Sequence, residues 1–221
     1  VLYGNTPKAV DLIREILTQS VFEDEKRLKE ILGEMKARLQ AQMTSAGHST
    51  ASLRALSYIS EGAWAADQIS GLEFLRFLAE LYNHFEQRKT DCIRELKTLL
   101  SFILHQNRVL YDYTGTEEGK KLFAEALLPF HKLLSAEDNR QEAFRAEPVK
   151  KQEGLCTSAG VQYVCRAGNF REAGLSYTGA LRVLRIMMGY DYLWIQVRVK
   201  GGAYGCMSNF TQSGLSYFVS Y

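Results

Sequence analysis

The sequence predicts an α+β fold in which a mostly helical part precedes the opening of a second, strand-containing part. Apolar residues repeat at helical spacing through most of residues 6–134, and short β-branched and aromatic runs follow later. Of the 17 glycines, 10 lie from Gly154 onward, which marks a change of composition. We therefore expect a mostly helical part at 1–135, a linker at 136–152 and an α+β part at 153–221.

The first helices are predicted from start signals and apolar stripes. Thr6 followed by Pro7 is typical of a helix start. The clearest helix runs from Asp24 to about Met43, with apolar residues on one face and charged residues on the others. Residues 46–48 should end it, and the run beginning at Ser49 can open another helix.

The next elements extend the helical part. Apolar stripes predict one helix over residues 71–86 and another that includes residues 96–104. The alternating, aromatic-rich run from Arg108 to Thr114 predicts a strand. Thr116, followed by two acids, predicts the cap of a helix that runs to about Leu134, with Pro129 as a kink.

The last third predicts strands around one helix. Residues 136–152 are polar and charged with little apolar periodicity, which is why we expect a linker there. Residues 161–165 and 215–221 favour strands, and residues 177–189 favour a helix.

Composition narrows the class of protein. A formal charge of +2 and the lack of a dense basic stripe argue against nucleic acid or an acidic membrane as partner. No run approaches the 18 apolar residues of a membrane helix. The four cysteines fit reduced thiols, although a disulfide between Cys156 and Cys165 stays open. We expect bacterial cytoplasm or an organelle matrix. The missing initiator Met and the final strand-like residues predict a piece of a longer chain.

The histidines form no recognisable metal or catalytic motif. The spacings of H-E-x-x-H and H-x-x-E-H do not occur, and no two histidines lie within one helical turn. We expect surface or capping roles for the four of them, His48, His84, His105 and His131. We therefore predict no metal site, no bound cofactor and no catalytic activity for the chain alone.

One segment carries candidate chemistry, the run from Tyr192 to Cys206. Gly201 and Gly202 interrupt the chain between Arg198 and Tyr204. A guanidinium and a phenol both donate hydrogen bonds to an oxygen that gains negative charge. The alternative is a tight turn with no role in chemistry.

The same segment resembles the presequence-protease branch of the insulinase/pitrilysin metallopeptidases. The similarity is most specific at residues 197–205, Val-Arg-Val-Lys-Gly-Gly-Ala-Tyr-Gly. Supporting stretches lie, in the family's order, at 45–48, 55–58, 153–154, 161–164 and 218–221. The last of these normally continues into Arg-Asp-Pro, which is missing.

The resemblance implies the C-terminal, non-zinc half of a zinc endopeptidase that degrades unfolded peptides in a closed chamber. It implies the helical end of one insulinase-type α+β domain, the third, and the first part of the fourth, an antiparallel sheet with helices packed on one face. The zinc would be bound by the N-terminal half of the same chain, the expected partner together with unstructured peptides. Arg198 and Tyr204 would hold the substrate carbonyl.

Two alternatives and one local conflict accompany this interpretation. The chain could be a non-catalytic scaffold subunit of the same fold, or a helical interaction module. The scaffold hypothesis predicts decay of the Arg198 to Tyr204 motif, which is intact. Residues 195–200 alternate as a strand does, whereas the resemblance implies a helix ending near Lys200 and a strand from Ala203. We expect the helix.

Overall fold

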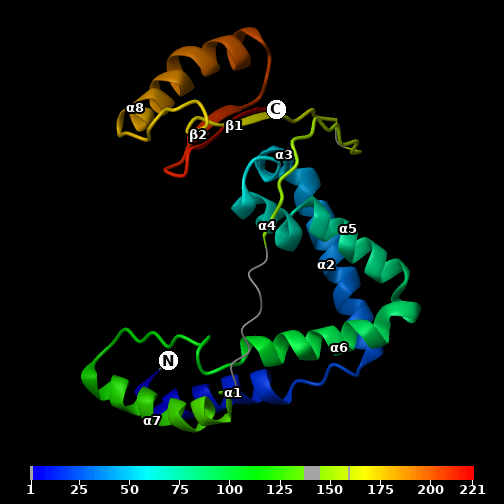
Figure 1. Ribbon diagram of the computed structural model, residues 1–221, viewed down its shortest axis with the longest axis vertical. Coiled ribbons are helices and arrows are strands. Elements are labelled where there is room, and N and C mark those ends of the chain that lie inside the picture. Colours follow the sequence, from blue (N-terminus) through cyan, green and yellow to red (C-terminus); the bar gives the residue numbers. More distant parts are fainter. Residues whose placement is uncertain (1, 137–144, 159) are drawn as a thin grey trace. The chain divides into compact units, whose positions relative to one another are not determined.

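The computed structural model describes residues 2–136, 145–158 and 160–221, and these form two compact units (Figure 1). The first unit comprises Val1–Ile31 with His84–Glu142, and the second comprises Leu32–Asn83 with Ala143–Tyr221. Part of the expected linker, residues 137–144, lies outside the described residues. No helix in the described part is long and apolar enough to span a membrane.

The first unit is helical. It contains a 3₁₀ turn η1 (Tyr3–Asn5) and all or part of four helices, which are α1 (Thr6–Gln19), the start of α2 (Glu25–Ser45), α6 (Phe85–Ile103) and α7 (Glu117–Leu133). Pro7 lies in the first turn of α1, as predicted, although Thr6 is the first helical residue and not the cap. The predicted Thr116 cap is confirmed, because its hydroxyl accepts from the backbone N–H of Gly119 at 3.2 Å.

Salt bridges join α2 to α6 within this unit. Lys29 pairs with Glu86 at 3.0 Å, and Lys89 pairs with Glu25 at 2.6 Å. These side chains are partly to largely exposed, so each pair contributes about 1 kcal/mol or less. Helix α1 also packs against α7, and Val10 of α1 and Phe130 of α7 are buried.

The predicted strand at 108–114 is wrong. These residues form no helix and no strand. Among the described residues, no other strand pairs with them. The aromatic residues pack on α7 instead: Tyr111 lies edge-on to Phe130, and Tyr113 contacts Phe123 with ring centroids 5.4 Å apart. The alternation therefore reflects two tyrosines that face a helix.

His105 also departs from the expected surface position. Its side chain is buried, and its Nδ1 accepts a hydrogen bond from the backbone N–H of Asn107 at 3.1 Å. The ring thus satisfies a turn that follows α6.

The second unit begins with helices. After the end of α2 come α3 (Gly47–Ser57), α4 (Glu61–Ser70) and α5 (Leu72–Asn83). The predicted break at 46–48 is confirmed, and the new helix starts there. The Ser60 hydroxyl caps α4, a helix that the apolar pattern alone did not indicate. Leu78 and Leu81 of α5 are buried and form the centre of this helical core.

A three-stranded antiparallel sheet completes the second unit. Its strands are β1 (Val164–Asn169), β2 (Cys206–Phe210) and β3 (Leu215–Ser220), in the order β1–β3–β2. Ser220 is the partner of Val164 on one side and of Cys206 on the other, which fixes the register. Gly214 turns the chain between β2 and β3 with φ +95°, a conformation that favours glycine. Helix α3 contacts β1 and β3.

The conflict over residues 195–200 is resolved in favour of a helix. Helix α8 (Ala180–Met187) continues as the π-helical stretch η2 (Met188–Lys200), which ends at the residue that the resemblance implied. Gly202, at φ +78°, lets the chain leave this helix, and its N–H donates to the Arg198 carbonyl at 3.0 Å. The following strand starts at Cys206, three residues later than expected.

Candidate functional site

Arg198 and Tyr204 flank the turn between η2 and β2, and the structure brings them together. The guanidinium carbon of Arg198 lies 3.9 Å from the Trp194 ring, one helical turn earlier, and 5.6 Å from the Tyr204 ring. A cation held near two aromatic rings loses little hydrogen-bonding capacity, because the rings use its flat face and leave its N–H edges free.

The polar groups of this pair are available to a ligand. Tyr204 is 76% exposed. Within residues 2–136, 145–158 and 160–221, no carboxylate pairs with Arg198, and no residue hydrogen-bonds the Tyr204 hydroxyl. Burial raises the pKa of the Cys206 thiol, and the positive charge of Arg198 opposes that shift only in part. The site therefore presents one fixed positive charge and one phenol donor to solvent.

Three tyrosines gather at one end of the sheet, each next to the end of a different strand. Tyr163 precedes β1, Tyr204 precedes β2 by two residues, and Tyr221 follows β3. The Tyr221 ring lies 5.9 Å from that of Tyr204 and 5.7 Å from that of Tyr163. His48, from the start of α3, stacks on Tyr221 at 5.0 Å. We call these four residues the aromatic row.

Two glycines allow the aromatic row to pack so closely. A Cβ at Gly205 would lie 2.8 Å from the Tyr221 ring, and one at Gly47 would overlap the Tyr163 ring. Gly205 and Tyr221 also exchange backbone hydrogen bonds at 3.0 and 3.1 Å, which extends the β2–β3 pairing past the strand ends. The turn that carries Tyr204 is therefore tied to the end of β3.

A second charged cluster in this unit centres on Arg54 of α3, whose side chain is only 8% exposed. Its guanidinium pairs with Asp67 at 2.6 Å and with Glu73 at 2.8 Å, and it holds Glu153 through two hydrogen bonds at 2.8 and 3.0 Å. Tyr58 donates a short hydrogen bond to Glu153. Three carboxylates from three separate segments thus converge on one arginine.

The charges of this cluster shift the pKa values of its members. Hydrogen bonds from Arg54 and then Tyr58 lower the pKa of Glu153 to about 2. Burial, followed by the hydrogen bond to Glu153, raises the pKa of Tyr58 to about 12. Glu153 is therefore ionised and Tyr58 neutral across the physiological range. Carboxylates take up most of the N–H groups of Arg54, so we interpret the cluster as structural.

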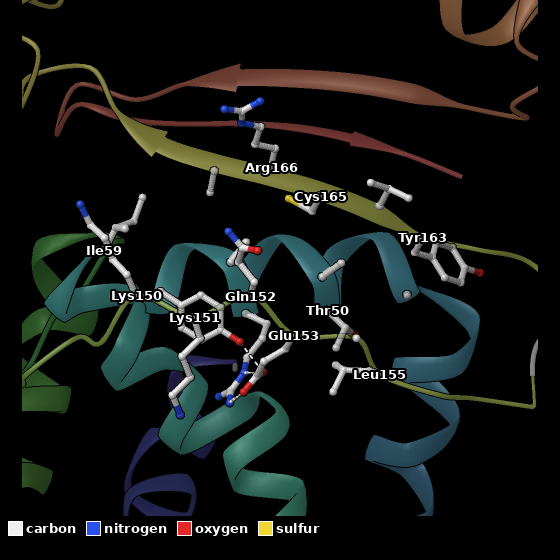
Figure 2. Close-up of a pocket in the computed structure, with 18 of the residues that line it drawn as sticks. Thr50, Ile59, Lys150, Lys151, Gln152, Glu153, Leu155, Tyr163, Cys165 and Arg166 are labelled. Carbon is white, nitrogen blue, oxygen red and sulfur yellow. Dashed lines mark hydrogen bonds and ion pairs between the residues drawn. The ribbon is translucent and has the colours of Figure 1, made fainter.

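A groove of about 1150 Å³ lies between α3 and β1, with residues 150–155 along its side (Figure 2). Glu153 lies in this segment (Figure 2), and its carboxylate accepts the two hydrogen bonds from Arg54 of α3. Tyr163 lines the same groove, so the groove reaches from the Arg54 cluster to the aromatic row. Cys165, on the face of β1 that meets α3, approaches Ser52 at 3.7 Å.

The residues that the structure describes form no cluster typical of a metal site. Within them, no group of three or more His, Cys, Asp or Glu could hold a metal ion. The four cysteines, including Cys156 and Cys165, are free thiols.

Comparison with known proteins places both regions of the chain in one family. Residues 1–81 match the family of domains associated with subfamily C of the M16 peptidases, and residues 152–221 match the "PreP C-terminal domain". The Arg54 cluster joins the two matched regions, because Arg54, Asp67 and Glu73 lie in the first and Glu153 in the second.

Individual relatives point to the same family as the two matched regions. Protein HypA of Clostridium perfringens is 37% identical over 220 residues, covering 100% of this chain and 22% of that protein. Presequence protease 1, chloroplastic/mitochondrial, of Arabidopsis thaliana is 24% identical over 99% of this chain and 20% of its own length. The mitochondrial presequence protease of Yarrowia lipolytica is 26% identical over 97% and 22%. The chain belongs to the presequence-protease type of M16 peptidases, and it spans about a fifth of the length of these relatives.

The sequence alone indicates the pair Arg198 and Tyr204 but not the cluster around Arg54. The pair Arg198 and Tyr204 lies within a single motif of nearby residues, which a sequence shows directly. Arg54 meets partners 13, 19 and 99 positions away, and no local pattern signals such a convergence. His48 belongs to one of the stretches that resemble the family, but its stacking on Tyr221 depends on a contact across 173 positions.

Proposed function

We propose that Arg198 and Tyr204 hold the scissile carbonyl of a peptide in a zinc metalloendopeptidase to which this chain contributes the substrate side. The observation that carries the proposal is the exposed pair itself, a guanidinium stacked on Trp194 beside a solvent-facing phenol. The match to the PreP C-terminal domain over the same residues supports it.

The pair suits an oxygen that becomes negative. When a peptide carbonyl is attacked, its oxygen gains charge, and preorganised donors aimed at that oxygen stabilise the transition state. Arg198 supplies a permanent positive charge, and stacking on Trp194 restricts its rotamers before substrate arrives. Tyr204 supplies a neutral O–H donor. Together they orient the carbonyl and stabilise the oxyanion.

In line with the sequence resemblance, we assign zinc to the N-terminal half of the same chain. That half would pack against this part of the protein. Zinc supplies a nucleophilic water at neutral pH. We derive no step through the metal for the residues of this chain, whose task is to bind and orient the peptide.

The substrates that fit this proposal are unstructured peptides, including targeting sequences, in bacterial cytoplasm or an organelle matrix. The names of the Arabidopsis and Yarrowia relatives, presequence proteases of mitochondria or chloroplasts, support this class. We further propose that residues 1–135 are the mostly helical part of a third α+β domain. Residues 136–152 would then be a linker and 153–221 the first part of a fourth domain.

The test is cleavage of a long unstructured peptide by the full-length protein and its Tyr204→Phe variant at matched zinc content. Loss of one oxyanion donor should lower kcat about 10²–10³-fold with KM little changed. Tyr190→Phe is the matched control, because it removes a phenol hydroxyl from an exposed tyrosine of the preceding helical stretch. Equal activity of the two variants would overturn the proposal and favour a non-catalytic scaffold of the same fold.

A further inference from the structure

Tyr204 has few contacts that could fix its position. It lies in an irregular segment between η2 and β2, it is largely exposed, and its ring neighbours are Arg198 and Tyr221. Arg198 is restrained by Trp194 on the helical side of the turn, whereas Tyr221 is the ring that ties Tyr204 to the sheet. We therefore expect the placement of the phenol to depend strongly on Tyr221.

Tyr221 is held on two sides. Its backbone exchanges two hydrogen bonds with Gly205, the residue next to Tyr204. Its ring stacks on His48 with an interplanar angle of 21° and a centroid distance of 5.0 Å. Offset-stacked rings at this distance stabilise each other beyond the area they bury. The His48 and Tyr163 rings both contact the Tyr221 ring, and His48 makes the closer, stacked contact.

His48 is in turn firmly placed. It is the second residue of α3, its carbonyl accepts a hydrogen bond from the Ser52 hydroxyl at 2.8 Å, and its neighbour Gly47 lies in direct contact with the Tyr163 ring. Further along, α3 carries the buried Arg54. Helix α3 thus holds the His48 ring at its first turn, where the ring supports Tyr221.

We infer that His48 is a positioning residue for Tyr204, acting through the stack His48–Tyr221–Tyr204. This inference rests on the proposed function, since it concerns the same phenol. It gives the first matched region of the chain, residues 1–81, a part in a site that otherwise lies wholly in the second. The reacting carbonyl would meet Arg198 and Tyr204, and His48 would make no contact with substrate.

The test measures kcat and KM separately in the full-length protein for His48→Ala and His48→Phe. A displacement of about 1 Å in a catalytic group can cost about 100-fold in rate. We expect His48→Ala to lower kcat about 10- to 100-fold with KM changed less than about threefold. His48→Phe keeps a ring on Tyr221 and should recover kcat to within a few-fold.

A double variant separates this inference from the proposed function. If His48 acts through the Tyr204 hydroxyl, adding His48→Ala to Tyr204→Phe should lower kcat by less than about threefold, because coupled residues are not additive. A full additive loss would overturn the inference, as would a loss in KM or no rescue by His48→Phe. Should Tyr204→Phe alone leave kcat unchanged, the proposed function fails. Should Tyr204→Phe lose activity while His48→Ala does not, only the positioning role fails.

Discussion

Two arginines in the same unit are held in opposite ways. Arg54 is buried, and its donors are taken up by three carboxylates. Arg198 lies between two aromatic rings, and no carboxylate of the described residues pairs with it. Both side chains are restrained, but their partners contact different surfaces of the guanidinium group. Carboxylates occupy the N–H edges of Arg54, which also lies over the Tyr58 ring at 5.2 Å, whereas Arg198 is held by rings without a carboxylate partner among the described residues.

The difference separates structure from function. A guanidinium whose N–H groups are mostly taken up by carboxylates holds its surroundings together and has little capacity left for a ligand. A stacked guanidinium is restrained while its hydrogen-bonding edges stay available. The contacts of the two arginines therefore predict a structural role for Arg54 and a binding role for Arg198. Substitution of Arg54 should therefore lower stability, whereas substitution of Arg198 should lower activity.

The largest expected effect is on stability at Arg54. Arg54→Ala leaves Asp67, whose side chain is 2% exposed, as an unpaired buried charge. Breaking such a pair from one side costs about 3–5 kcal/mol. In the full-length protein, amide hydrogen exchange of peptides from α3 and residues 145–158 should lose protection by a factor of about 10² or more.

Arg76→Ala is the control for that change. Arg76 pairs with the same Glu73 at 2.8 Å, but its side chain is 53% exposed, so its loss should cost about 1 kcal/mol or less. Equal protection in Arg54→Ala and Arg76→Ala would mean that the buried cluster does not hold the two regions together.

The elements of the fold follow from local pattern wherever one helix or strand face is buried. The helix at 25–45 and the cap at Thr116 are predictable because their signals lie within a few residues. The strand predicted at 108–114 fails because alternation indicates one buried face and does not say what covers it. There the aromatic residues pack on α7 in place of a sheet.

The candidate site is predictable in part for the same reason. Arg198 and Tyr204 belong to one short motif, and the glycines between them indicate a turn. His48 and Tyr221 cannot be paired from sequence, since the fold alone brings the start of α3 to the end of β3. The convergence of Asp67, Glu73 and Glu153 on Arg54 is equally non-local.

A smaller effect, on activity, is expected at Arg198. Arg198→Ala removes the positive charge beside the proposed oxyanion, and loss of one such group lowers kcat about 100-fold, equivalent to about 2.7 kcal/mol. Exchange protection near α3 should stay unchanged, which is the reverse of the Arg54→Ala result. Arg182→Ala, an exposed arginine of α8, is the control for loss of charge. A drop in protection at α3 without loss of kcat would make Arg198 a second structural arginine.

The smallest effect concerns pH and Glu153. The pKa of this carboxyl is about 2 in the folded protein, against an ordinary value of 4.5, because Arg54 and Tyr58 donate to its ionised form. The folded state therefore binds fewer protons than the unfolded state. The stability this contributes is fully present above pH 4.5 and is lost as pH falls from 4.5 toward 2.

Glu153→Gln tests that window directly. The amide keeps the shape of the side chain but does not titrate, so protection of residues 145–158 should change less between about pH 5 and about pH 2.5 than in the unsubstituted protein. The loss at neutral pH should be smaller than for Arg54→Ala, because Arg54 keeps Asp67 and Glu73 as partners. The measurement is hydrogen exchange corrected for the intrinsic rate at each pH. Identical acid dependence in the two proteins would mean that another carboxylate of the cluster governs its release.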